Sequence, residues 1–315
     1  MGSTPRSIRI ATRESSLALR QTNMVASALR DTDPQTPVEI VGMTTKGDRV
    51  LDRPLAQVGG KGLFVKELEV ALEDGRADIA VHSMKDVPMQ LPEGFALATF
   101  GAREDPLDAF VSSRYSTLDA MPRGAAVGTS SLRRECQLRR AFPGLEFRML
   151  RGNVNTRLAK LDRGEYDAII LAAAGLKRLG LAARIRATVP SSVALPAIGQ
   201  GILAIEYRRD RDDLAQRLAA FEDPATSAAA RAERALGLVV EGSCEVPVGG
   251  FARVEGDALT LDGFIGFPDG TRFVRERVSG AAADAENLGA RLGDLLLQAG
   301  GREILAALAR AGARA

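Results

Sequence analysis

The stretch Asp78-Ile79-Ala80-Val81-His82-Ser83-Met84-Lys85-Asp86-Val87-Pro88 predicts a buried strand that delivers charged residues onto a loop. Its apolar residues 79–81 have the length of a short buried strand. Polar side chains follow at once, and Pro88 disfavours helical geometry in the residue before it. Ligands of open α/β sheets bind outside the carboxyl ends of the strands. We therefore expect a functional site here, with Asp86 as the group that performs chemistry.

The composition favours a globular protein of two or three domains. The chain has 315 residues, of which 45% are hydrophobic and 26% charged, and a net charge of +2 that gives no general affinity for polyanions. No apolar run is long enough to span a bilayer, and residues 1–10 lack a secretory signal pattern, so we expect a cytoplasmic protein. Two cysteines and one histidine provide no disulfide framework and too few ligands for a standard zinc site, so we expect no metal.

Two α/β lobes are predicted from the order of strand and helix patterns. Residues 1–101 and 202–219 form the first lobe and residues 107–195 the second, with hinge crossings at 102–106 and 196–201. The second lobe echoes the first: residues 125–132 resemble 8–17, and 164–171 resemble 75–81. Either an internal duplication or the shared pattern of βα units explains this echo. Both explanations place two lobes face to face, with paired helix N-termini at a cleft.

A third domain is predicted over residues 224–315. Asp223-Pro224 has the form of an N-cap followed by proline at the first helical position. Three strand-like runs, interrupted at 256–257 and 268–270, predict an antiparallel sheet. The leucines at 288, 292, 295 and 296 predict a helix that covers one face of that sheet.

Arginines near helix starts and strand ends give the strongest functional signal. Guanidinium groups bind carboxylates and phosphates bidentately, so several of them around one cleft favour a ligand with many acidic groups. Solvated surface charge is the alternative for any one of them. We expect them in turns or first helical turns, and they are Arg13, Arg133, Arg134, Arg151, Arg157 and Arg178.

Five other residues have competing interpretations. Asp86 and Lys85 could form an ordinary surface ion pair, and His82 is more simply a packed, hydrogen-bonded histidine than a catalyst. Cys136 falls on the apolar face of its helix, which predicts a buried thiol. Cys244 lies in a loop bounded by glycine and proline. Two neighbouring glutamates and a preceding helix C-terminus disfavour its thiolate, which favours an attachment point over a nucleophile that turns over.

One series of motifs extends along nearly the whole chain. Its runs are Ile10-Ala11-Thr12-Arg13, Gly59-Gly60-Lys61-Gly62-Leu63-Phe64-Val65-Lys66-Glu67-Leu68, Val81-His82-Ser83-Met84-Lys85-Asp86-Val87-Pro88, Gly128-Thr129-Ser130-Ser131-Leu132-Arg133-Arg134, Leu150-Arg151-Gly152-Asn153, Leu195-Pro196-Ala197-Ile198-Gly199-Gln200-Gly201 and the loop around Cys244. This series resembles the motifs of the porphobilinogen deaminase (hydroxymethylbilane synthase) family, in the order of that family. The small departures are Glu14, Asn155 and Ser243, where glutamine, glycine and glycine are frequent.

The resemblance implies a specific activity and a covalent cofactor. It implies stepwise condensation of four porphobilinogen units with loss of ammonia, followed by hydrolytic release of a linear tetrapyrrole. Cys244 would hold a dipyrromethane by a thioether, and Asp86 would stabilise the positive charge that develops as ammonia leaves. The six arginines would bind the acetate and propionate groups, with further contacts from Lys61, Lys85, Ser15, Ser83, Thr129 and Ser131.

The implied fold is α/β, with two periplasmic-binding-protein-like (type II) lobes around a cleft. A small C-terminal α/β domain with a three-stranded antiparallel sheet would carry the cysteine, and the enzyme would be a monomer without a membrane or nucleic-acid partner. The main alternative is a two-lobed protein that binds an acidic small molecule without catalysis. A nucleic-acid binder that uses Arg133, Arg134, Arg139 and Arg140 ranks lower, because base-stacking aromatics are sparse.

Overall fold

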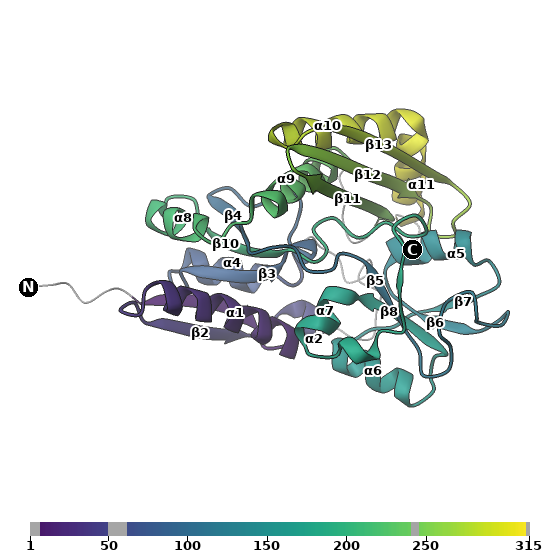
Figure 1. Ribbon diagram of the computed structural model, residues 1–315, viewed down its shortest axis with the longest axis horizontal. Helices are drawn as coiled ribbons and strands as arrows, with labels where there is room; N and C mark the ends of the chain where they lie inside the picture. The colour runs from purple at the N-terminus through teal and green to yellow at the C-terminus, as the bar shows by residue number, and fades with distance from the viewer. Residues whose placement is uncertain (1–6, 50–61, 241–245, 313–315) are drawn as a thin grey trace, which may run out of the picture.

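Three separate β-sheets organise the chain, of which the computed structural model describes residues 7–49, 62–240 and 246–312. Two five-stranded sheets lie side by side, and a three-stranded sheet with its helices lies above them in the view of Figure 1. None of the helices in these three ranges is long and apolar enough to cross a lipid bilayer.

The first sheet combines four strands from residues 8–100 with one strand from residues 203–208. Its order is β2-β1-β3-β10-β4, and β10 runs antiparallel to both of its neighbours. Helices α1 and α8 pack on one face and α4 on the other. The strands are β1 (Ile8–Arg13), β2 (Val38–Met43), β3 (Ile79–Ser83), β4 (Phe95–Phe100) and β10 (Leu203–Arg208), and the helices are α1 (Ser16–Thr32), α2 (Lys46–Arg49), α4 (Lys66–Glu73) and α8 (Asp212–Ala219).

The second sheet repeats the plan of the first. Its order is β7-β6-β8-β5-β9, with three parallel strands followed by an antiparallel β5. In each sheet the antiparallel strand is the one that the chain enters from the other lobe, which confirms the predicted pair of type II lobes. The strands are β5 (Asp108–Val111), β6 (Ala126–Gly128), β7 (Glu146–Arg148), β8 (Ala168–Ala172) and β9 (Ala187–Val189), and the helices are α5 (Leu132–Ala141), α6 (Val154–Asp162) and α7 (Ala173–Arg178).

The sequence echo between the lobes corresponds to one shared local structure. The Asp78 carboxylate accepts a hydrogen bond from the backbone N–H of Arg9 in β1 at 3.0 Å. The Asp167 carboxylate accepts one from the N–H of Ala126 in β6 at 2.9 Å. Each aspartate also donates its own backbone N–H to the carbonyl of the same partner residue. The repeated Gly-x-x-Asp pattern therefore fixes the start of the central strand in both lobes.

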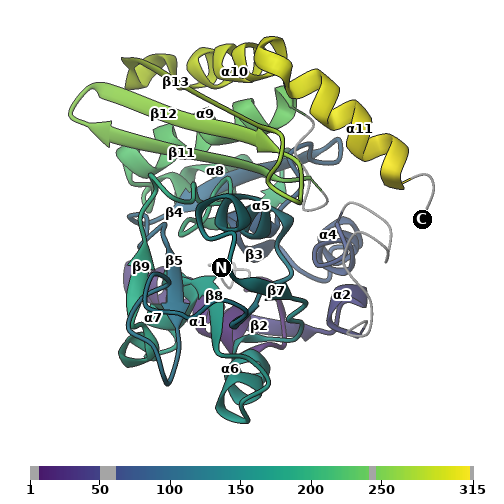
Figure 2. The ribbon, with the colours of Figure 1, turned by 90° about the vertical axis from the view of Figure 1, so that its right-hand side faces the viewer.

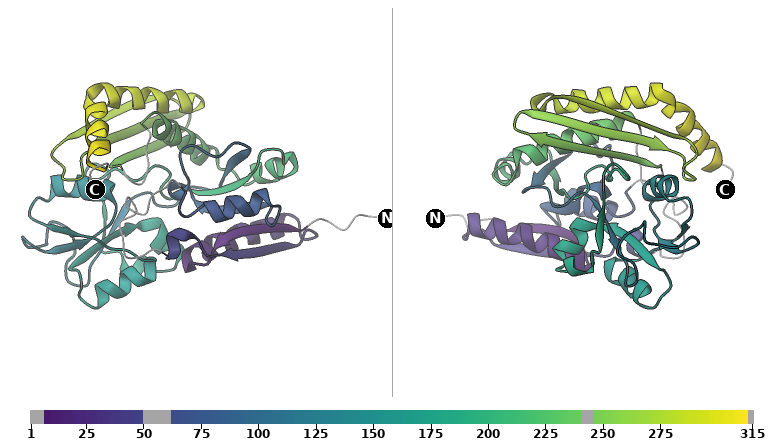
Figure 3. Two further views of the ribbon diagram at one scale, coloured as in Figure 1. Left: turned by 180° about the vertical axis from the view of Figure 1, so that it is seen from behind. Right: turned by 45° about the vertical axis from the view of Figure 1, so that its right-hand side comes forward.

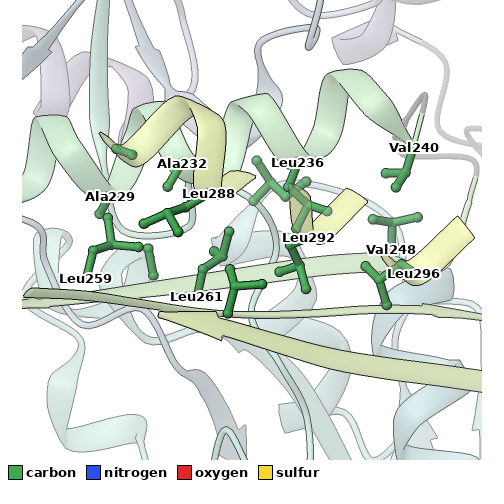
Figure 4. Packing of buried hydrophobic residues seen from close by; sticks show 14 of the residues in the cluster. Ala229, Ala232, Leu236, Val240, Val248, Leu259, Leu261, Leu288, Leu292 and Leu296 are labelled. Atoms are coloured by element: carbon green, nitrogen blue, oxygen red, sulfur yellow. The ribbon is translucent and has the colours of Figure 1, made fainter. Parts of the chain in front are cut away.

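The C-terminal unit is a three-stranded antiparallel meander with helices on one face, as predicted. Asp223 caps α9 through its carboxylate, and Pro224 is the first residue of that helix. Helices α9 and α10 lie along the strands (Figure 2), and alanines of α9 and leucines of α10 form one apolar core with them (Figure 4). The elements are α9 (Pro224–Val239), β11 (Val248–Glu255), β12 (Ala258–Gly266), β13 (Phe273–Ala281), α10 (Ala285–Leu296) and α11 (Arg302–Gly312).

The opposite face of this small sheet packs on the second lobe. Cys136 of α5 is fully buried there against Phe264 and Phe251, so the predicted buried thiol is confirmed. Burial raises the pKa of the Cys136 thiol to about 12, so the thiol stays protonated at neutral pH. The C-terminal unit thus contacts both lobes, through β4 of the first and α5 of the second (Figure 3).

The two crossings between the lobes lie against each other. The backbone N–H of Glu104 donates to the carbonyl of Gly201 at 3.1 Å. Gly201 has a φ of +89°, and a Cβ there would lie 2.2 Å from the Glu104 carbonyl oxygen, so only glycine fits. At the other end of the cleft, the Asn155 side chain donates to the hydroxyl of Ser16 at 3.4 Å and joins the N-termini of α6 and α1.

Candidate active site

Most of the predicted site residues that the structure describes come together at the carboxyl ends of the strands in both lobes. Three adjoining cavities form one continuous cleft, because they share lining residues. Asp86 lines the first and second cavities, Lys85 lines the first and third, and Ser83 lines the second and third. The cationic residues around the cleft are Arg13, Lys85, Arg133, Arg134, Arg151, Arg157 and Arg178.

Asp86 is held by a short turn with a buried anchor. Residues Met84–Asp86 form a single 3-10 turn, where the sequence predicted only an irregular loop. Met84 is buried among Val87 and Ile202, and its backbone N–H donates to the carbonyl of Ile202 at 3.0 Å. The Asp86 side chain is half-buried, and no hydrogen bond or ion pair within the described ranges engages its carboxylate. Its oxygens therefore face the cleft as available acceptors.

Lys85 is a half-buried cation on the same turn. Burial lowers the pKa of its ammonium to about 8, and the neighbouring Asp86 carboxylate opposes that shift. The side chain is therefore charged at neutral pH and begins to lose its proton only slightly above it. The ion pair between Lys85 and Asp86 considered from the sequence does not occur among the contacts of the described residues, and both residues line the same cavity.

Asp108 organises the arginines of the second lobe, and the sequence analysis did not single it out. Its carboxylate accepts from Arg133 at 2.8 Å, from Arg134 at 2.9 Å and from the amide of Gln200 at 2.9 Å. Burial alone would raise the pKa of Asp108, but the two guanidinium groups hold it well below its usual range. One permanent carboxylate thus orients two arginines and leaves them with a net positive charge. Its position at the start of the strand after a crossing was the available signal.

The remaining arginines are buried or stacked, and they stay cationic. Burial lowers the pKa of Arg157 to about 10, with a smaller contribution from Arg134, and burial also lowers that of Arg178 to about 10. Arg13 lies with its guanidinium carbon 4.3 Å from the ring centroid of Phe64. The predicted position of Arg178 in a first helical turn is wrong, since it ends α7. It still lines the cleft, because its guanidinium donates to the carbonyl of Gly201 at 2.7 Å.

The hydroxyl residues have different positions. The Ser15 and Ser131 hydroxyls cap α1 and α5 and line the cleft. Thr129 is buried and accepts from the backbone N–H of Ser131 at 3.2 Å, so it supports the turn, and it lines none of the three cavities described above. Ser83 exchanges hydrogen bonds with Gln21 of α1, a buried residue that the sequence analysis missed.

Two predicted residues, Lys61 and Cys244, lie outside the described residues. The first described residue after Cys244, Val246, lines the cavity that also contains Asp86, as does Val248 of β11. Helix α9 ends at Val239, shortly before the same segment.

Comparison with known proteins identifies the family. Two family profiles match, "Porphobilinogen deaminase, dipyromethane cofactor binding domain" over residues 8–216 and "Porphobilinogen deaminase, C-terminal domain" over residues 227–298. A porphobilinogen deaminase of Nitrosomonas europaea is 55% identical over 307 residues, which cover 98% of this chain and 100% of that protein. One from Thiobacillus denitrificans is 55% identical over 301 residues, which cover 96% and 98%.

The chain belongs to the porphobilinogen deaminase family. This result confirms the resemblance read from the motifs, and with it the transferase class. Among solved structures, the aliphatic sulphonate binding protein SsuA of Escherichia coli is 13% identical, with a TM-score of 0.41 over 76% of this chain and 72% of that chain. A likeness at that level carries no functional argument.

The cleft of this deaminase suits the dipyrromethane of its family. Seven cationic side chains line the cleft, and the only acidic residue among the lining residues of the three described cavities is Asp86. Such an excess of guanidinium groups requires an anionic occupant, and carboxylates match their planar donor geometry. The Nε of Arg133 is in addition buried without a partner in the described structure. The donor set therefore fits a molecule with several carboxylate substituents.

Proposed function

We propose that this deaminase joins four porphobilinogen units head to tail onto a dipyrromethane attached through a thioether to Cys244. Ammonia is lost at each condensation, and hydrolysis releases the linear tetrapyrrole, hydroxymethylbilane. The observation that carries the assignment of the site is the half-buried Asp86 carboxylate, which faces a cleft with seven cationic groups around it. Family membership replaces the alternative of a two-lobed binding protein without catalysis.

The arginines hold the carboxylates of the pyrroles. Asp86 shares the first cavity with Arg133, Arg134, Arg151 and Arg157 and the second with Arg13, whereas Arg178 lines the third. This division provides anion sites on either side of the catalytic carboxylate. Lys85 adds a positive charge, and the hydroxyls of Ser15, Ser83 and Ser131 add neutral donors. Thr129 supports the turn at Ser131. Lys61 is proposed as a contact from its motif alone. When bound, the dipyrromethane supplies the carbon to which the first porphobilinogen is joined.

Asp86 acts on the reacting porphobilinogen. Its carboxylate oxygens accept hydrogen bonds from pyrrole N–H groups and stabilise the positive charge that develops as the C–N bond of the aminomethyl group breaks. The turn Met84–Asp86 is suited to this role, because the buried Met84 fixes the turn while the Asp86 carboxylate stays free. A preorganised charge of this kind stabilises the transition state without reorganisation.

The finer assignments belong to the same proposal. The lobes comprise residues 1–101 with 202–219 and residues 107–195, and residues 224–315 form the domain that bears Cys244. The crossings at 102–106 and 196–201 are hinges that let the cleft adapt to a lengthening chain. We place the enzyme in the cytoplasm as a monomer with no nucleic-acid partner.

Intact-mass spectrometry and one variant test this proposal. Protein made in cells that supply porphobilinogen should exceed its sequence mass by two linked pyrroles, and Cys244→Ser should lack that excess. Asp86→Asn retains the size of the side chain but removes its charge, so kcat should fall at least 10²-fold with the added mass still present. Glu93→Gln, an exposed change from carboxylate to amide, is the matched control and should behave like the wild type. Absence of the pyrrole mass from the wild type, or near-normal turnover by Asp86→Asn, would contradict the proposal.

A further inference from the structure

A buried histidine and glutamate lie directly behind the catalytic turn. His82, the one histidine of the sequence, precedes Asp86 by four residues and lines the same cavity. Its Nε2 lies 3.0 Å from the Glu206 carboxylate, and the side chains are 4% and 0% exposed. The two residues are diagonal neighbours on β3 and β10, because Ala204 is the residue directly opposite His82. The sequence prediction of a packed, hydrogen-bonded histidine is confirmed, but that prediction does not explain its access to the cavity.

The contact with Glu206 decides the tautomer of the imidazole. A carboxylate accepts hydrogen bonds, so Nε2 carries the proton and Nδ1 has a free lone pair. No hydrogen bond in the described part of the chain uses Nδ1. His82 itself lines the cavity that Asp86 also lines. A buried carboxylate that fixes one imidazole nitrogen and stabilises the imidazolium is the arrangement that makes histidine a general base.

Other charged groups around the pair favour movement of a proton through it. Oε1 of Glu206 is buried and has no partner among the described residues. Arg234 of α9 approaches from the C-terminal unit, and its guanidinium donates to the carbonyls of Pro88 and Met89 at 2.9 and 2.7 Å. From α4, burial and the charge of Glu206 raise the pKa of Glu69 to about 7, and Lys66 and Glu73 lie farther out. On the cavity side, His82 shares its cavity with Arg13 and Asp86.

The proposed reaction releases one proton for every unit joined. Each condensation breaks the C–N bond of a protonated aminomethyl group and a C–H bond at a pyrrole carbon, and it forms one C–C bond. Ammonia leaves with the electron pair of the C–N bond, and the electron pair of the C–H bond returns to the ring. The proton from that carbon must leave the cleft before the next cycle. Asp86, as the only carboxylate lining the cleft in the described structure, can take it but must then lose it again.

We propose that His82, oriented by Glu206, is the base that removes this proton from Asp86 between cycles. Nδ1 accepts the proton directly or through one water, the imidazolium is stabilised by the Glu206 carboxylate, and solvent at the mouth of the cleft takes the proton in turn. His82 is then a relay residue that resets Asp86, and Glu206 is a positioning residue. This inference rests on the proposed function, because it requires Asp86 to act in the condensation.

The pH dependence of kcat tests the relay with the full-length, cofactor-loaded enzyme. In the wild type, kcat should show an acid limb that depends on His82, because a protonated imidazole cannot accept. Glu206→Gln removes the charge that stabilises the imidazolium, so this acid limb should move to lower pH. His82→Gln cannot titrate, so kcat should fall about 10²-fold near neutral pH and the limb should disappear. His82→Ala should recover part of its kcat when imidazole is added, and Glu93→Gln is again the control.

A purely structural pair gives different results. If all His82 and Glu206 variants lose activity equally at every pH, and imidazole restores nothing, the relay is wrong. Wild-type kcat and pH dependence in His82→Gln would overturn it as well. Mass spectrometry of each variant confirms that the pyrroles are attached before kinetics are compared. A wild-type enzyme without pyrrole mass or tetrapyrrole product contradicts the proposed function, whereas an active wild type with unaffected His82 variants contradicts the relay alone.

Discussion

Glu233 connects the C-terminal unit to both crossings, and Glu233→Gln is predicted to destabilise the protein strongly. Its carboxylate is fully buried in α9 and accepts from Arg103 at 2.6 Å, from the backbone N–H of Gly199 at 2.7 Å and from that of Ala252 at 2.8 Å. Arg103 belongs to one crossing, Gly199 to the other and Ala252 to β11. One side chain therefore satisfies donors from three segments that are distant in sequence.

The expected cost follows from the burial of both charges. The Arg103 side chain is only 11% exposed, so removal of the Glu233 charge leaves a guanidinium without compensation in a largely dry site. Breaking such a pair by removing one partner costs about 3–5 kcal/mol. The amide of glutamine can still accept from one backbone N–H, but its NH2 group faces a donor, which leaves at least one polar group unsatisfied. We therefore expect Glu233→Gln to lower the free energy of unfolding by about 4 kcal/mol.

Urea denaturation followed by circular dichroism measures this loss, and a double-mutant cycle isolates the pair. Arg103→Gln with Glu233→Gln should cost clearly less than the sum of the two single changes, because neither charge is then left alone. Glu165→Gln is the matched control, since Glu165 pairs with Arg163 on the surface, where both side chains are about half exposed. That change should cost at most about 1 kcal/mol. A loss below about 1 kcal/mol for Glu233→Gln, or additivity in the cycle, would refute the reasoning.

Two further predictions concern the catalytic turn. Burial lowers the pKa of Lys85 to about 8, so its positive charge is lost as the pH rises through that value, and KM for porphobilinogen should increase above pH 8. Lys85→Arg should keep KM low to higher pH. A wild-type KM that does not change with pH would argue against a role of Lys85 in anion binding. Gly199 has a φ of +72°, and a Cβ there would lie 2.6 Å from Cγ of Met84 and 3.2 Å from the backbone nitrogen of Lys85. Gly199→Ala should therefore displace the catalytic turn and lower kcat more than 10-fold. Gly256→Ala is the control, because Gly256 has a similar φ of +58° but a Cβ there would meet no atom within 4 Å. This change should cost only about 1 kcal/mol of stability and leave kcat unchanged. Equal kcat in Gly199→Ala and Gly256→Ala would contradict this account.

Local patterns in the sequence sufficed for most of the elements and for the family. The strand at 79–83, the capping residues Ser15 and Asp223, and the three-stranded meander follow from apolar periodicity and from hydrogen bonds that close within a few residues. The placement of Asp86 after a buried strand was predicted for the same reason. The 3-10 turn and the α2 helix were missed, because single turns carry almost no periodic signal.

Long-range charge pairs were beyond the reach of the sequence. Asp108 contacts Arg133 and Arg134 across 25 and 26 residues, and Glu206 contacts His82 across 124. Nothing local distinguishes these buried carboxylates from exposed ones, because the cost of their burial is offset only by partners that the fold brings near. Thr129 shows the converse, since its motif suggested a ligand contact and the structure makes it a support for Ser131.

The sequence by itself determined most of the secondary structure and the family, and it predicted the anion-binding residues, because short-range periodicity and motif chemistry are encoded in neighbouring residues. Only the tertiary structure decided which cations share a cavity, which of them are already paired, and which side chains stand behind Asp86. Those properties depend on burial and distance, and both arise when β10 and the crossings return the chain to the first lobe. The His82–Glu206 pair exists for that reason alone.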